Sequence, residues 1–150
     1  MDSLQIDTGE KRIAINGDEN RVIVFNPSDT IFREKFYRLI GDFQTKLTEY
    51  QVRGVALDEK KELDANGLPI NMSDRLALEK ESCLYIRQKI DELFGEGTSQ
   101  KAFDDSMVLR FEEKKPGPFE QFFSGIMSYV QKESTQKVQK YSNKKQKRTL

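Results

Sequence analysis

The sequence has no histidine among its 150 residues. This absence excludes catalytic triads and dyads that use an imidazole, zinc sites with histidine ligands, and a histidine acid–base pair near neutral pH. We therefore predict a protein that is not an enzyme, with no catalytic residues, no cofactor and no bound metal ion.

Cysteine and long apolar runs are also scarce. Cys83 is the only cysteine, so an internal disulfide is excluded and a reducing compartment is favoured. No apolar run approaches the roughly 20 residues that cross a bilayer. The first ten residues lack the basic and apolar regions of a secretion signal. We expect a cytoplasmic protein with no membrane partner.

Charge is balanced overall but unevenly distributed, with 25 basic and 25 acidic residues. Six basic residues follow the last acid, Glu133. Without those six, 19 basic groups face 25 acidic ones, so residues 1–136 carry about −6. The body is therefore acidic and the C-terminal tail is basic.

Two short β-branched runs near the N-terminus predict a β-hairpin. They span residues 11–16 and 21–26 and are separated by residues 17–20, which are rich in turn formers. An isolated hairpin is marginal in water. We therefore expect it to pack on helices, to gain a strand from residues 4–6, or to pair with another chain.

Apolar residues at steps of three and four then predict three helices. The first follows a cap at Ser28 or Asp29, and the second begins near a cap at Ser73 and ends at Gly95. The third begins at about Phe119. The stripe of the first helix contains Phe32, Phe36, Leu39, Ile40, Phe43, Leu47 and Tyr50. That of the second contains Leu76, Leu78, Cys83, Ile86, Ile90, Leu93 and Phe94.

These elements predict a mainly α protein of the α+β class. We expect one domain over residues 1–132, in which a hairpin at about residues 4–26 packs on a bundle of about three helices. Residues 133–150 have few apolar groups, which predicts a basic tail that is a frayed helix or disordered.

Three segments imitate ligand sites. Residues 62–67 resemble the start of a calcium loop, but the twelfth position is Ser73 rather than a bidentate Glu. Residues 95–101 lack the Gly-Lys-Ser/Thr ending of a phosphate loop, which favours a helix C-cap. Asp104 and Asp105 could bind a metal in a hydrolase, although adjacent acids are usually a solvated surface or a helix cap.

The basic tail supports an alternative function. Lysines and an arginine within residues 137–148 could neutralise nucleic-acid phosphates. The tail is short and the body is acidic, which disfavours nucleic acid and favours a tail that solubilises the protein or docks an acidic partner.

Residues 90–103 and 119–126 carry a family resemblance, in the elements Phe-Gly-Glu-Gly-Thr and Phe-Glu-Gln-Phe-Phe. They resemble small proteins of Firmicutes prophages and phage-tail-like gene clusters, of the tail assembly chaperone type. The matching positions are Phe94, Gly95, Gly97, Thr98, Phe103, Phe119, Phe122 and Phe123.

The resemblance implies a non-enzymatic protein of the bacterial host cytoplasm that binds the tape measure protein during tail assembly. The client would be the tape measure or tail tube protein, and the eight matching positions would be structural or would contact the client. The apolar helical stripes agree with a helical client, since such helices bind in apolar grooves. A homo-oligomer is a further expectation, because a small domain can complete its core by association.

Overall fold

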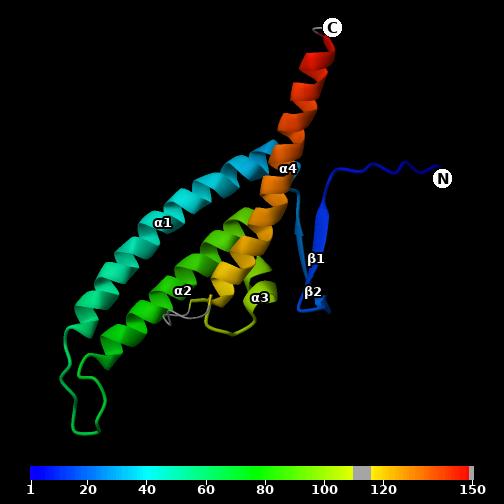
Figure 1. The fold of residues 1–150 in the computed structure, drawn as a ribbon. Coiled ribbons are helices and arrows are strands. Elements are labelled where there is room, and N and C mark those ends of the chain that lie inside the picture. Colours follow the sequence, from blue (N-terminus) through cyan, green and yellow to red (C-terminus); the bar gives the residue numbers. More distant parts are fainter. Residues whose placement is uncertain (110–115, 149–150) are drawn as a thin grey trace.

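The computed structural model describes residues 1–109 and 116–148, and it describes the side chains of residues 1–109 and 116–135. An N-terminal hairpin is followed by helices, which confirms the expected α+β class (Figure 1). The elements are β1 (Lys11–Ile15), β2 (Asp18–Phe25), α1 (Thr30–Asp58), α2 (Met72–Phe94), α3 (Thr98–Phe103) and α4 (Pro118–Arg148).

The strands β1 and β2 form a two-stranded antiparallel sheet that turns at Asn16 and Gly17. Both turn residues have a positive φ, 53° at Asn16 and 74° at Gly17. Asn-Gly is the pair that best accepts this type of hairpin turn. β2 consequently begins at Asp18, so the prediction of a turn over residues 17–20 was wrong. The alternative in which residues 4–6 add a strand is also not formed, because they lie outside both strands.

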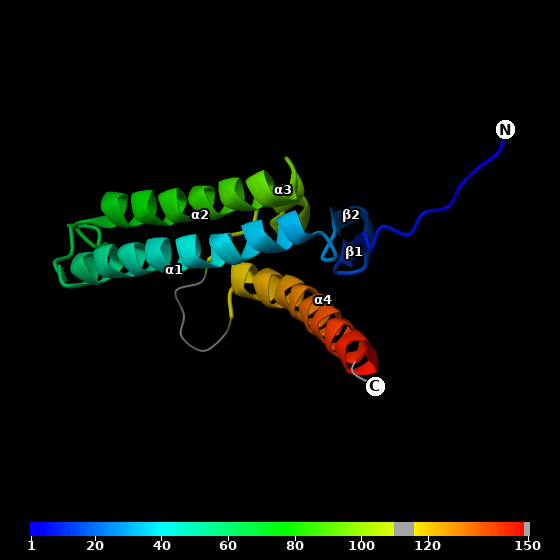
Figure 2. The same cartoon turned by 90° about the horizontal axis from the view of Figure 1, so that it is seen from above.

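Helices α1 and α2 run antiparallel as neighbours, as expected for two helices joined by a short loop (Figure 2). Asp29 caps α1, and its side chain accepts a hydrogen bond from the backbone N–H of Ile31 at 2.9 Å. The apolar stripe of α1 is confirmed as the buried face. Its buried members are Phe32, Phe36, Leu39, Phe43 and Tyr50.

The start of α2 differs from the prediction. The helix begins at Met72, and the N-cap position belongs to Asn71 rather than Ser73. The Asn71 amide donates to the backbone oxygen of Leu57 at 2.9 Å, so this side chain joins the two helix ends instead of capping its own helix. The core-facing row of α2 is Leu78, Ser82, Ile86 and Ile90. Leu76 is 55% exposed, so its assignment to the core stripe was wrong.

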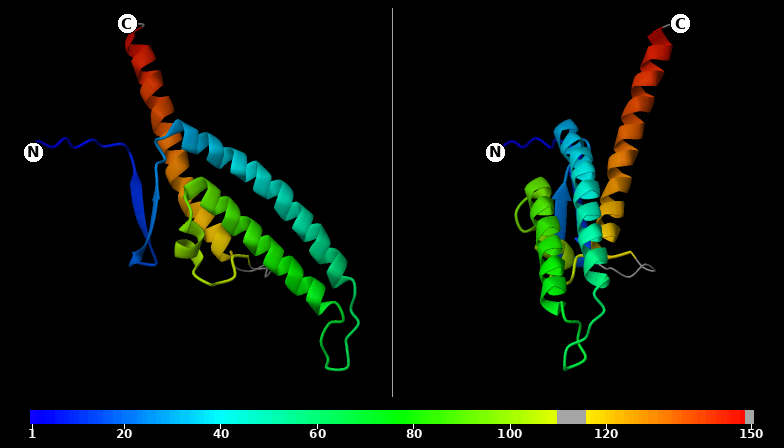
Figure 3. Two further views of the ribbon diagram at one scale, coloured as in Figure 1. Left: turned by 180° about the vertical axis from the view of Figure 1, so that it is seen from behind. Right: turned by 90° about the vertical axis from the view of Figure 1, so that its left-hand side faces the viewer.

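Helix α4 starts with proline, which fits the first turn because an N–H there has no helical partner. The backbone N–H of Phe119 donates to the oxygen of Val108 at 2.9 Å and holds this start against the segment after α3. Farther along, Glu133 accepts a hydrogen bond from the hydroxyl of Ser28 at 2.9 Å. The helix then extends beyond the rest of the molecule to Arg148 (Figure 3).

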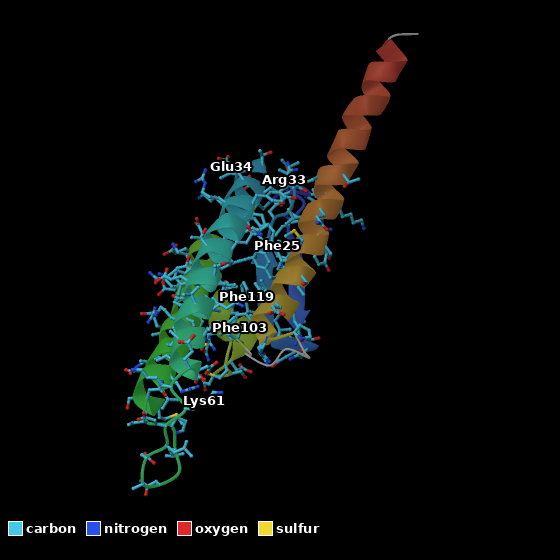
Figure 4. The ribbon with its side chains drawn as sticks, turned by 60° about the vertical axis from the view of Figure 1, so that its left-hand side comes forward. Phe25, Arg33, Glu34, Lys61, Phe103 and Phe119 are labelled. Atoms are coloured by element: carbon cyan, nitrogen blue, oxygen red, sulfur yellow. The ribbon has the colours of Figure 1, made fainter. Side chains whose placement is uncertain are left out.

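The core consists of two clusters that share their border residues. One cluster lies between α1, α2 and the start of α4, and the other joins the hairpin to α1 and α4. Phe94, Phe122 and Phe123 pack against both. Figure 4 shows Phe25 and Phe119 in the interior between α1 and α4. The hairpin is therefore packed on the helices, which was one of its three expected outcomes.

Candidate protein-binding groove

The five phenylalanines of the family resemblance pack together, with Phe103 and Phe119 buried and the other three half-buried. The ring centroids of Phe94 and Phe103 are each 5.5 Å from that of Phe122. Those of Phe119 and Phe123 are 5.4 Å apart. Tilted and edge-on rings at such distances stabilise a core beyond their burial alone. The set therefore joins α2, α3 and α4.

The other three positions form the turn between α2 and α3. Gly95 has φ 115° and Gly97 has φ 88°, a region that glycine enters without strain. The N–H of Gly95 donates to the oxygen of Asp91 at 2.9 Å, which confirms the C-cap interpretation. The carboxylate of Asp91 also accepts a hydrogen bond from the N–H of Ser99 at 2.8 Å. This backbone N–H of the turn, which a phosphate loop would offer to its ligand, is therefore bonded to an acidic side chain. Thr98 is buried.

These eight residues therefore have a structural role in the fold. Phe103 and Phe119 are 4% and 5% exposed, so their side chains offer little surface to another protein. Contact of any of the eight with a client stays a prediction. Phe94, Phe122 and Phe123 are half-buried and keep part of their surface exposed. More fully exposed apolar side chains lie elsewhere on the surface.

Two arginines hold α3 and the segment that follows it. Arg21 of β2 donates to the backbone oxygens of Lys101 and Ala102 at 2.7 and 3.0 Å. It also forms an ion pair with Asp104 at 3.1 Å. Cations at a helix C-terminus are stabilised by the exposed carbonyl groups there. Arg21 therefore fixes the hairpin to the end of α3.

Arg87 of α2 acts from the opposite side. Its guanidinium donates to the backbone oxygens of Asp104 and Ser106 at 2.6 and 2.9 Å. Asp104 has φ 51° and ψ −138°, a conformation that a non-glycine residue adopts only when its surroundings impose it. The segment from Asp104 to Met107 is thus held beside the outer face of α2.

A groove of about 490 Å³ lies between this segment and α2. We call it the α2 groove. Its apolar members are Leu76, Leu84, Met107 and the half-buried Cys83. Leu76, Leu84 and Met107 are 55%, 56% and 49% exposed. Its polar lining consists of Glu79, Lys80, Arg87, Gln100, Asp104, Asp105 and Ser106.

The lining suits an amphipathic partner more than a small charged ligand. Leu76, Lys80 and Leu84 follow one another at steps of four and share a face of α2. Charges of both signs border the apolar residues. An apolar strip with a mixed polar rim is the usual pattern of a surface that receives an amphipathic helix.

The sequence did not predict this groove for three reasons. Leu76 was assigned to the core, and Leu84 was left out of the helical stripe although it lies on the same face of α2 as Leu76. Met107 belongs to an irregular segment, where periodicity gives no information. The sequence signal that could have identified the groove is the second apolar row of α2, formed by Leu76 and Leu84.

The acidic segments that imitate metal sites have other partners. Asp64 accepts hydrogen bonds from the N–H groups of Asn66 and Leu68 within its own loop. Asp105 accepts from the Gln100 amide at 3.1 Å, while Asp104 pairs with Arg21. Over residues 1–109 and 116–135, no three acids or cysteines gather closely enough to hold a metal ion.

Comparison with known proteins places the chain in a family without assigning a role. None of the helices, as far as they are described, is long and apolar enough to cross a membrane. No curated protein and no solved structure matches the chain. A family profile matches residues 19–150, which include β2 from its second residue and all four helices but not β1. The chain belongs to this family, described as a family of unknown function (DUF6673).

Proposed function

We propose that this protein is a non-enzymatic assembly chaperone for a phage-like tail, and that it binds a helix of the tape measure protein in the α2 groove. The exposed apolar row of α2 carries the proposal, since Leu76 and Leu84 lie beside Met107 instead of in the core. The resemblance of residues 90–103 and 119–126 to tail assembly chaperones supplies the client. The protein would act in the bacterial cytoplasm, where tails assemble.

Burial of the groove residues would drive binding. Each of Leu76, Leu84 and Met107 retains about half of its surface in the free protein. Full burial of such a side chain contributes about 1.5–3 kcal/mol, so half of that remains available from each. The surrounding charges would orient an amphipathic helix and keep the free groove soluble.

Co-expression with the tape measure protein encoded beside it tests the proposal. The expected result is co-purification and increased client solubility. Leu84→Asp places a charge in the groove and should weaken binding at least about tenfold, as loss of a central apolar contact does. Val52→Asp is the matched control, because Val52 is a 65% exposed helical position on α1 outside the groove. Absence of co-purification, or equal binding by both variants, would overturn the proposal.

The alternative function, nucleic-acid or regulatory binding by the basic tail, stays a prediction. The side chains of residues 136–150 lie outside the described residues. Binding through the tail would depend steeply on salt, with a log–log slope of about −0.9 for each neutralised phosphate. Truncation after residue 136 should abolish it, while client binding in the α2 groove should survive.

A further inference from the structure

The N-terminal arm, residues 1–10, precedes the first strand and projects from the molecule (Figures 1 and 2). Leu4 is 89% exposed and Ile6 is 75% exposed. Residues two apart lie on the same face of an extended chain, so these two side chains form a short apolar row. The arm therefore has the alternating pattern of a β-strand, although it pairs with no strand among the described residues.

The base of the arm is fixed in the fold. The amide of Asn26 donates to the backbone oxygen of Thr8 at 2.8 Å. Gly9 has φ 84°, and a Cβ placed there would lie 2.3 Å from the hydroxyl oxygen of Ser28. These contacts hold residues 8 and 9 beside the segment that follows β2, so the arm leaves the fold from a fixed point. The arm does not pair with its own β1, which leaves it available to a second molecule.

The hairpin offers the complementary surface. Its inner face carries Ile13, Ile23 and Phe25, which pack in the core. The register pairs Ala14 with Val22 and Arg12 with Val24, so Val22 and Val24 lie on the opposite face. Both valines keep part of their surface exposed. A strand that is apolar on both faces is typical of a sheet covered on both sides.

The outer edge of β1 is also open. The sheet has the order β1-β2, and no third strand pairs with β1 among the described residues. α2 and α3 contact β2, the strand at the opposite edge of the sheet. Free strand edges bind further strands through their unpaired backbone groups.

Charge favours the same pairing. The arm contains Asp2, Asp7 and Glu10 and has no lysine or arginine. β1 begins with the exposed residues Lys11 and Arg12. Opposite charges on neighbouring strands are favourable, whereas two acidic arms would repel each other.

We propose that residues 3–7 of one copy add as a strand to the free edge of β1 in a second copy, with Leu4 and Ile6 extending the apolar face of Ala14, Val22 and Val24. Reciprocal exchange of arms produces a two-fold symmetric dimer in which each copy donates and receives one strand. The dimer uses the hairpin end of the molecule and leaves the α2 groove free. It does not depend on the proposed function.

Light scattering after size-exclusion chromatography tests the dimer with the full chain. The expected mass is twice the chain mass of 17.4 kDa. The double variant Leu4→Asp/Ile6→Asp should elute as a monomer. Leu63→Asp/Leu68→Asp is the matched control, since these leucines are 63% and 49% exposed in the α1–α2 loop, and it should stay dimeric. A monomeric wild-type protein at millimolar concentration, or a dimer unaffected by the arm variant, overturns the proposal.

Disulfide trapping tests directly whether the arm of one copy lies beside β1 of another. In a Cys83→Ser background, the single-cysteine variants Ile6→Cys and Ala14→Cys are mixed and oxidised. The proposal expects a cross-linked heterodimer, because only a strand in trans can bring the two thiols together. Ile6→Cys mixed with Leu68→Cys is the control. Equal cross-linking in both mixtures overturns the proposal.

Discussion

Replacement of Arg87 by alanine should destabilise the protein measurably, although the side chain is only partly buried. The variant removes hydrogen bonds of 2.6 and 2.9 Å to the oxygens of Asp104 and Ser106. It also removes a guanidinium 5.8 Å from the centre of the Phe103 ring. Hydrogen bonds to a charged group contribute about 1.5–3 kcal/mol, but solvent reaches these, so we take about 1 kcal/mol for each. The total loss is about 2 kcal/mol.

A loss of that size lowers the melting temperature of a chain this long by about 4–8 °C. Thermal unfolding followed by circular dichroism measures the change. Hydrogen exchange of amides 101–108 should accelerate in the variant, because Arg87 holds this segment against α2. Arg53→Ala is the control, since its ion pair with Glu81 is solvent-exposed and contributes at most about 1 kcal/mol. Equal melting temperatures for the two variants would refute the role of Arg87.

Two further predictions concern α1 and α2. Ile86→Ala should cost about 2–5 kcal/mol in a denaturant titration, because Ile86 is fully buried, whereas Leu84→Ala on the exposed face should change stability by less than about 0.5 kcal/mol. Burial raises the pKa of Tyr50 above its usual value of 10.0, so the unfolded state ionises first and stability falls as the pH rises above 10. Tyr50→Phe should flatten this alkaline loss between about pH 9 and about pH 11, and an unchanged loss would contradict the assignment.

Local patterns determined most of the secondary structure. The apolar steps of α1 repeat with the helical period, so its buried face could be read from Phe32 to Tyr50. The cap at Asp29 and the C-cap at Gly95 follow from chemistry within a few residues. The turn was misplaced because two adjacent sets of turn formers compete, and the Asn16-Gly17 pair accepts the two positive φ angles more readily.

Contacts between distant residues required the tertiary structure. Ser73 was expected to cap α2, but the helix begins earlier, and the side chain of Asn71 at the cap position donates to the oxygen of Leu57 at the end of α1. The exposed row of α2 lines a groove because the segment around Asp104 lies beside it. Arg87 holds that segment there through its hydrogen bond to the Asp104 oxygen.

The sequence alone thus determined a hairpin followed by amphipathic helices, because strand and helix periodicity depend on neighbouring residues. Tertiary structure decided which apolar residues remain outside. Phe103 and Phe119 of the resembling motifs are buried, while Leu84 and Met107 are half exposed. Periodicity identifies a face of a helix, but only packing decides whether another element covers that face.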